Sequence, residues 1–266
     1  MTSLIFLLFL VFCIHFIAKE RGFYTLEKGT GSLTPTLAEL LLVFGIYLTT
    51  LLFVGPYLNQ LIAKLELAHF VTISLCLLLL LVTSYLMRRE LFYKIWKNRA
   101  VTSRSIGSDL IFGMLTYLIS LPVVLLIGEA AEGATQLLFG KREYEQVAVT
   151  YFKAMVRSPG TLLRACLTIL IIGPVTEELL FRGFLQNYLK GYLNRIGAIL
   201  LASFLFALFH FSPAQSIGNI PILASLFAFS FFLGYVYEKR ASLFSSIGLH
   251  MAFNAATLLR LFLSQE

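Results

Sequence analysis

Apolar runs long enough to cross a lipid bilayer recur along this 266-residue chain, and they restrict it to a helical membrane fold. Because no water reaches the bilayer core, backbone N–H and C=O groups there must bond within the protein, and a helix achieves this inside one segment. Hydrophobic residues make up 58% of the chain and charged residues 13%, with a mean hydropathy of +0.84. This composition excludes a soluble domain of ordinary size.

We expect an all-α fold of about eight transmembrane helices in one membrane domain. The first run lacks a basic segment before it and is followed by Lys19 and Arg21, which favours an uncleaved helix over a signal peptide. Residues 1–159 would hold helices one to four and a connector, and residues 160–266 the functional core. The predicted spans are 4–18, 37–57, 69–87, 111–127, 162–188, 196–211, 220–237 and 243–263.

The distribution of basic residues predicts the topology. Lys and Arg number 13 in loops one, three, five and seven and 7 elsewhere, with the intramembrane Arg182 left out. The loop after the third span, residues 88–104, is the most basic. By the positive-inside rule these loops are cytoplasmic, so both termini lie on the opposite side of the membrane.

An amphipathic helix is expected between the fourth and fifth spans. Its apolar residues recur at helical spacing, as expected for a helix on the membrane surface. A packed connector is the preferred interpretation, and a guide for substrate is the alternative. The residues are Tyr144, Val147, Ala148, Tyr151 and Met155.

The remaining composition excludes several classes of function. Cys13, Cys76 and Cys166 fall inside apolar runs without metal-type spacing, which indicates small packing residues. The formal charge of +7 comes from loop residues that membrane orientation explains, so nucleic acid is not an expected partner.

Three ionisable residues, Glu177, Glu178 and Arg182, lie inside the fifth apolar run. Charged side chains at membrane depth normally face the protein interior or a wet cavity. On a helix Glu178 and Arg182 stack with the acid N-terminal, which favours an ion pair, while Glu177 points about 100° away. A structural salt bridge and a functional site are both open interpretations at this point.

Polar side chains on two other spans reach the same depth. Phe206 and His210 lie on the sixth predicted span, and His250 and Asn254 share a face of the eighth. Counted by helical rise, His210, His250 and Glu177 lie within about 10 Å of one level near the midplane. A carboxylate and a histidine can deprotonate a water, and a histidine and an asparagine can donate to an oxyanion. His15 and His69 are expected to be hydrogen-bonded core residues.

At these positions the chain resembles the CPBP family, the CAAX proteases and bacteriocin-processing proteins that include the type II CAAX prenyl endopeptidases. The motifs are Glu177-Glu178-x-x-x-Arg182, Phe206-x-x-x-His210 and His250-x-x-x-Asn254, in order, over about residues 160–260. The first 160 residues carry no family motif.

The resemblance implies an intramembrane glutamate protease. Glu177 and His210 would activate water, and His250 and Asn254 would form the oxyanion site. Glu178 and Arg182 would shape and charge-balance the site. We expect no metal cofactor, because neither HExxH nor a compact His/Cys cluster occurs. A catalytic metal, if there were one, would take Glu177, His210 and His250 as ligands.

The expected partners are membrane lipid and a peptide or a prenylated or membrane-anchored protein, cleaved near its terminus. A non-catalytic immunity or partner-binding protein of the same fold is the first alternative; the complete motif set favours catalysis. A proton-coupled transporter is the second, since intramembrane Glu and His also mark ion paths. Transporters more often show internal repeats, and none is evident.

Overall fold

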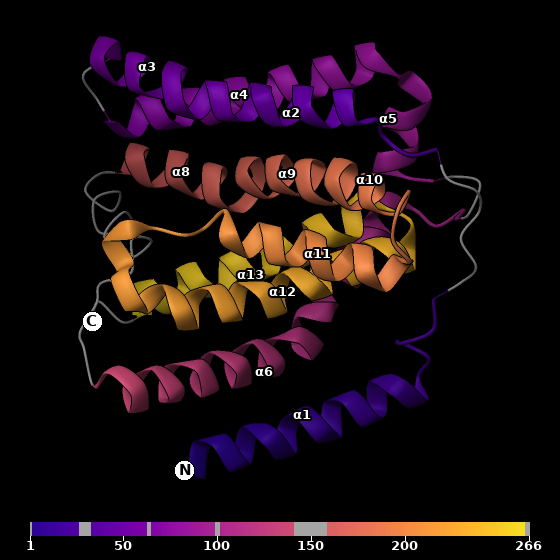
Figure 1. The fold of residues 1–266 in the computed structure, drawn as a ribbon, viewed down its shortest axis with the longest axis vertical. Helices are drawn as coiled ribbons and strands as arrows, with labels where there is room; N and C mark the ends of the chain where they lie inside the picture. The colour runs from indigo at the N-terminus through magenta and orange to yellow at the C-terminus, as the bar shows by residue number, and fades with distance from the viewer. Residues whose placement is uncertain (1, 27–32, 63–64, 99–101, 141–158, 264–266) are drawn as a thin grey trace.

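The computed structural model describes residues 2–26, 33–62, 65–98, 102–140 and 159–263. Within these residues every regular secondary-structure element is a helix (Figure 1). The α-helices are α1 Thr2–Glu20, α2 Leu37–Thr49, α3 Gly55–Ile62, α4 Leu65–Met87, α5 Arg89–Trp96, α6 Ile106–Phe139, α8 Pro159–Leu167, α9 Gly173–Glu178, α10 Asn187–Leu189, α11 Arg195–Leu208, α12 Asn219–Arg240 and α13 Leu243–Leu263. The π-helical segments are η1 Thr50–Val54, η2 Thr168–Ile172 and η3 Leu179–Gln186, and η4 Pro213–Gly218 is a 3₁₀ helix.

The predicted all-α polytopic membrane fold is confirmed. Among the described residues, six continuous helical stretches are long and apolar enough to cross a membrane. Each coincides with a predicted span. The predicted spans 4–18 and 196–211 correspond to α1 and to the shorter apolar helix α11. Eight crossings therefore stay a prediction. The amphipathic connector predicted over 144–155 lies outside the described residues.

The fourth span differs most from its predicted bounds, since α6 covers Ile106–Phe139 where hydropathy predicts 111–127. It begins earlier because the Ser105 side chain accepts the Ser108 N–H and caps the helix. It ends later, at Phe139, and the next residue, Gly140, has a φ of +76°, which glycine adopts without the steric cost of a side chain. Hydropathy misses these extensions because Ser108 and Asp109 precede the predicted span, and Glu129, Glu132 and Gln136 follow it.

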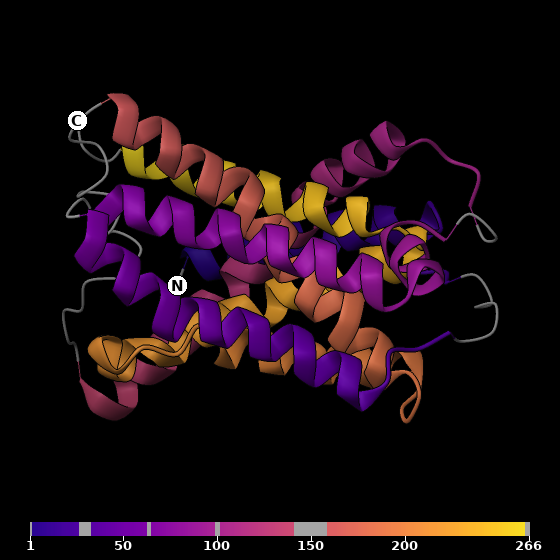
Figure 2. The ribbon, with the colours of Figure 1, turned by 90° about the horizontal axis from the view of Figure 1, so that it is seen from above.

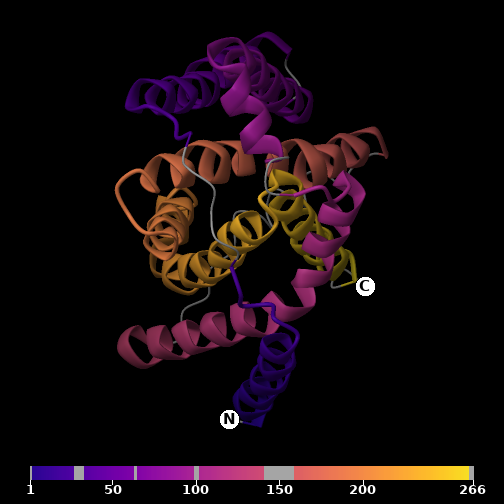
Figure 3. The same ribbon diagram turned by 90° about the vertical axis from the view of Figure 1, so that its right-hand side faces the viewer.

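The helices stack in layers. Figure 1 shows α2, α3 and α4 at one edge, the continuous rod α8–η2–α9–η3–α10 next, then α11 to α13, α6, and α1 at the opposite edge. Seen from above, α2 and α4 lie side by side over the bundle (Figure 2). Figure 3, turned to face the right-hand side, shows α11, α12 and α13 grouped beside the rod. The rod is thus covered by α2 and α4 on one face and by α11 to α13 on the other.

The basic loops meet at one end of the bundle. Buried Asp109 at the start of α6 accepts from Lys97 Nζ at 2.6 Å and from Arg240 Nε at 3.0 Å. Lys239 Nζ donates to the Gly22 and Thr25 carbonyls at 2.9 Å each. These contacts join loops one, three and seven, so the alternation predicted from charge agrees with the fold.

Loop five joins the same set of ionic contacts. Glu238, near the end of α12, accepts from Lys190 Nζ at 2.7 Å and from Arg195 Nε at 3.0 Å. Gln186 at the end of η3 adds a third donor at 3.1 Å. Several of the basic side chains that predict orientation are therefore also structural partners of buried carboxylates.

An aromatic cluster fixes α2 against the functional core. Phe44 of α2 packs edge-on against Phe181 of η3 and Phe209, with ring centroids 5.6 and 5.9 Å apart. Phe181 in turn meets Phe206 of α11 at 5.1 Å. Helix α2, from the part of the chain that carries no motif, thus packs directly against the motif-bearing helices.

The cysteines are free, as expected for packing residues. Cys76 is fully buried in α4, whereas Cys13 and Cys166 are half-buried. Of the three cysteines, only Cys76 is fully buried, as a core packing residue would be.

Helices α6 and α13 approach so closely that two glycines are required. A Cβ on Gly113 would lie 1.9 Å from the Ser245 carbonyl oxygen, and one on Gly248 would lie 2.3 Å from the Leu110 carbonyl oxygen. Backbone atoms cannot move aside as a flexible side chain would. Small residues of this kind permit close helix packing in membranes. This contact places His250, two residues after Gly248, against the bundle interior.

We expect Gly113→Ala to destabilise the protein by about 1–3 kcal/mol or more, because its Cβ would overlap backbone atoms of α13. Gly133→Ala is the matched control in the same helix, since a Cβ there meets no atom within 4 Å. It should leave stability unchanged or raise it slightly. Melting temperatures of both variants in detergent decide the point, and equal values would contradict the packing argument.

Candidate active site

The two glutamates lie on a short α-helical piece between two π-helical segments. Gly173 N–H bonds back to the Thr168 carbonyl, one residue further than in an α-helix, and this π turn precedes Pro174. The sequence predicts a kink here; the structure accommodates the proline with the π turn. α9 ends at Glu178, and η3 begins directly after it. Such π segments occur frequently at functional sites.

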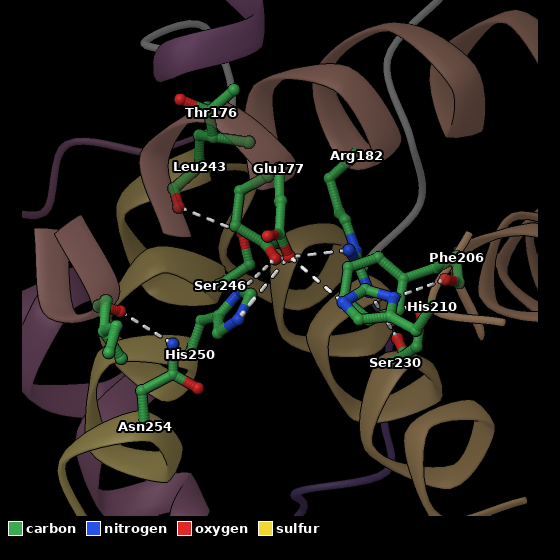
Figure 4. Close-up of polar contacts among 12 residues, drawn as sticks. Thr176, Glu177, Arg182, Phe206, His210, Ser230, Leu243, Ser246, His250 and Asn254 are labelled. Atoms are coloured by element: carbon green, nitrogen blue, oxygen red, sulfur yellow. Dashed lines mark hydrogen bonds and ion pairs between the residues drawn. The ribbon is translucent and has the colours of Figure 1, made fainter. Parts of the chain in front are cut away.

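Glu178 and Arg182 form the predicted i,i+4 ion pair, with Oε1 and Nη1 3.2 Å apart and both side chains at most 1% exposed. Arg182 also donates from Nη2 to the Ser230 hydroxyl at 2.7 Å and to the Ser230 carbonyl at 3.0 Å (Figure 4). Its guanidinium lies 4.6 Å from the centroid of the Phe206 ring. The buried cation is thus neutralised, hydrogen-bonded and stacked.

His250 binds the same carboxylate, a contact that sequence reasoning missed. Its Nδ1 lies 2.8 Å from Glu178 Oε1, and the side chain is buried. An ionised carboxylate can only accept, so Nδ1 carries the proton. In the neutral imidazole, Nε2 is then an acceptor, and it faces Glu177 at 3.8 Å.

Glu177 lies between the two histidines. Its Oε2 is 3.9 Å from His210 Nε2 and 3.8 Å from His250 Nε2, too far for direct hydrogen bonds. Oε2 has no hydrogen-bond partner within the described part of the chain. The side chains of Glu177 and His210 are 25% and 35% exposed, against 6% for His250. At these distances a water can bridge the carboxylate and an imidazole.

His210 lies two residues after the end of α11 and is oriented by the last turn of that helix. Its Nδ1 lies 2.9 Å from the Phe206 carbonyl oxygen, which can only accept. Nδ1 therefore carries a proton, and in the neutral ring Nε2 is free to accept one. Phe206 thus serves the site twice, with its carbonyl on His210 and its ring under Arg182.

Asn254, one helical turn after His250, uses its amide nitrogen to donate to the Ile169 carbonyl at 2.8 Å. Figure 4 shows the Asn254 side-chain oxygen pointing away from this hydrogen bond. The expectation that Asn254 donates to an oxyanion then concerns its second N–H.

Two further residues near the site were not predicted. Ser230 carries no motif signal, and it holds Arg182 from α12. The ring of Tyr47, in α2, lies 6.3 Å from that of Phe209, which precedes His210 in the sequence. Only the packing of α2 onto the core brings Tyr47 there.

The other two histidines lie away from the site. His15 donates from Nε2 to the Ile119 carbonyl at 3.2 Å, as expected of a bonded structural residue. His69 is half-buried.

The predicted alternative metal ligands do not match the geometry of one zinc ion. Ligands of a tetrahedral zinc at 2.0–2.1 Å are about 3.3 Å apart. The separations from Glu177 Oε2 are 3.8 and 3.9 Å. Across the described residues, no group of three His, Cys, Asp or Glu side chains is arranged to hold a metal.

Residues 159–256 match the family model described as Type II CAAX prenyl endopeptidase Rce1-like. This segment is an Rce1-like domain. Comparisons with curated proteins and with solved structures gave no match. The domain contains α8 to α12 and α13 as far as Ala256, and with them every predicted site residue. The family resemblance read from the motifs is confirmed. It indicates an intramembrane protease of the CAAX type.

We expect Glu178→Gln to destabilise the Rce1-like domain strongly, by about 3–5 kcal/mol, because it leaves buried Arg182 without its counter-charge. Glu177→Gln is the matched control, with the same change in charge one residue away and no lost hydrogen bond at Oε2. Its melting temperature in detergent should stay close to that of the parent. Equal losses for the two variants would contradict the separation of roles.

Proposed function

We propose that the protein is an intramembrane glutamate endopeptidase in which Glu177 and His210 activate a water molecule. The observation that carries the proposal is the geometry around Glu177 Oε2, a carboxylate oxygen without a protein hydrogen bond between two imidazole nitrogens at 3.8 and 3.9 Å. Buried polar atoms without a protein partner are natural sites for water or substrate donors. The Rce1-like domain supplies the reaction class, hydrolysis of a peptide bond.

The reaction needs a base, and the site offers two acceptors. A water between Glu177 Oε2 and His210 Nε2 gives up a proton to one of them as its oxygen attacks the peptide carbonyl carbon. The tetrahedral intermediate then breaks its C–N bond, and the amine leaves with the proton that the base had taken. General-base and general-acid action by one positioned group contributes about 10²–10⁴-fold to such a rate.

His250 and Asn254 are proposed as the oxyanion site. When His250 carries both protons, Nδ1–H stays on Glu178 and Nε2–H can donate to the oxyanion. Asn254 retains one N–H beyond the bond to Ile169. Glu178 and Arg182 hold this arrangement and balance its charge, since their pair and the Ser230 bonds fix both side chains.

The proposed substrate is a peptide bond near the terminus of a prenylated or otherwise membrane-associated protein or peptide. The surroundings of His210 support this choice. Phe209 and Phe211 flank it and are 44% and 57% exposed, and Leu208 is 44% exposed. An apolar rim next to a half-exposed polar site suits a chain that carries a lipid or lies in the membrane.

Replacing Glu177 with Gln tests the assignment. We expect Glu177→Gln to lower kcat for a membrane-anchored reporter peptide by about 10²–10⁴-fold, since it removes the base and keeps the shape. KM and melting temperature should change little. A chelator arm is included, and undiminished parent activity in EDTA is expected.

Two results would contradict this function. Normal cleavage by Glu177→Gln would exclude it as the base. Binding of the reporter without any cleavage by the parent would favour the alternative, a non-catalytic partner-binding or immunity protein.

We also propose that the basic end of the bundle faces the cytoplasm, with both termini on the other side. Two cysteine variants, Glu90→Cys next to Arg89 and Lys239→Cys, should then react with an impermeant thiol reagent only from the cytoplasmic side. Leu138→Cys, beside Gly140, should react only from the opposite side. The native cysteines are first replaced by alanine. Labelling of all three from one side would mean that the topology is wrong.

A further inference from the structure

Pro174 leaves one carbonyl of the catalytic helix without a backbone donor. In an α-helix the Ile169 carbonyl accepts from Gly173 N–H, but that N–H bonds to Thr168 instead. If the π register of η2 continued by one residue, the donor to Ile169 would be residue 174, and proline has no N–H. The Ile169 carbonyl is therefore open at the point where α13 passes.

The Asn254 amide takes the place of the missing donor. Its Nδ2 lies 2.8 Å from the Ile169 oxygen, and because a carbonyl only accepts, the amide must present its nitrogen there. A second asparagine acts in the same way beyond the glutamates. Asn187 Nδ2 donates to the carbonyls of Arg182 and Gly183, in η3, at 3.1 and 2.8 Å. Side-chain amides thus satisfy carbonyls of the π segments on both sides of the glutamate pair.

We propose that Pro174, Ile169 and Asn254 form a link that sets the spacing between Glu177 and His250. Asn254 lies one turn after His250 on α13, and Ile169 lies two turns before Glu177 on the rod. The bond ties the two helices beside the site, where Oε2 and Nε2 are held 3.8 Å apart. Asn254 is therefore a positioning residue as well as a proposed oxyanion donor. The link to catalysis rests on the proposed function.

A double-mutant cycle separates the two roles. Asn254→Leu keeps most of the side-chain volume and removes the donor, while Pro174→Ala restores a backbone N–H that can bond to Ile169 in the π register. We expect Asn254→Leu to lower the melting temperature and to reduce kcat about 10²-fold with little change in KM, since small misplacements of reacting groups cost that much. In the double variant, Pro174→Ala should recover at least half of the lost melting temperature and about tenfold in kcat.

Additive effects in both measurements would overturn the proposal, because an asparagine that acts only on the oxyanion is indifferent to residue 174. Asn254→Ala is run in parallel, and if either single variant fails to fold, recovery of monodisperse protein on adding Pro174→Ala is the supporting result. Failure of the double variants to recover counts against the link.

A matched asparagine controls for general stability. Asn194 accepts the Gly197 N–H at 2.8 Å and caps α11. Asn194→Ala should lower the melting temperature without any coupling to Pro174→Ala. The melting-temperature cycle needs no activity, so a parent protein that cleaves nothing would refute the proposed function and leave the link testable. Conversely, an active parent with an additive cycle would refute the link alone.

Discussion

The buried pair of Glu178 and Arg182 is the interaction that holds the site together. Two charges at most 1% exposed within an apolar bundle are tolerated only when each is paired and hydrogen-bonded. Arg182 reaches α12 through Ser230, and Glu178 reaches α13 through His250. The requirement to satisfy these charges therefore fixes three helices relative to one another.

The same contacts determine the protonation pattern of the site. Both histidines donate a hydrogen bond from Nδ1–H to an oxygen that can only accept. For His250 this oxygen belongs to the Glu178 carboxylate, and for His210 it is the Phe206 carbonyl. Their Nε2 atoms then face Glu177 Oε2 at similar distances. In the proposed function, the unpaired carboxylate oxygen of Glu177 and Nε2 of His210 hold the water, while His250 takes the other side of the site as an oxyanion donor.

Hydropathy and motif spacing alone are enough to predict the fold class, the bounds of most helices and the motif residues. Hydropathy is enough to predict the helices because each helix makes its backbone hydrogen bonds within its own segment. The spacing of Glu178 and Arg182 suffices for their ion pair because both lie on one helix, about one turn apart. The three motifs suffice for the family, which the match over residues 159–256 confirms.

The faces at which different helices meet follow only from their packing in three dimensions. His250 bonds to Glu178 across 72 residues, and Asn254 bonds to Ile169 across 85. Neither contact has a periodic signal, because periodicity describes one helix and says nothing of its neighbour's rotation. That rotation depends on the close approach of α6 to α13 at their two glycines and on the π segments that shift the register around the glutamates. Backbone geometry of this kind is set by packing between helices, which a single helix does not encode.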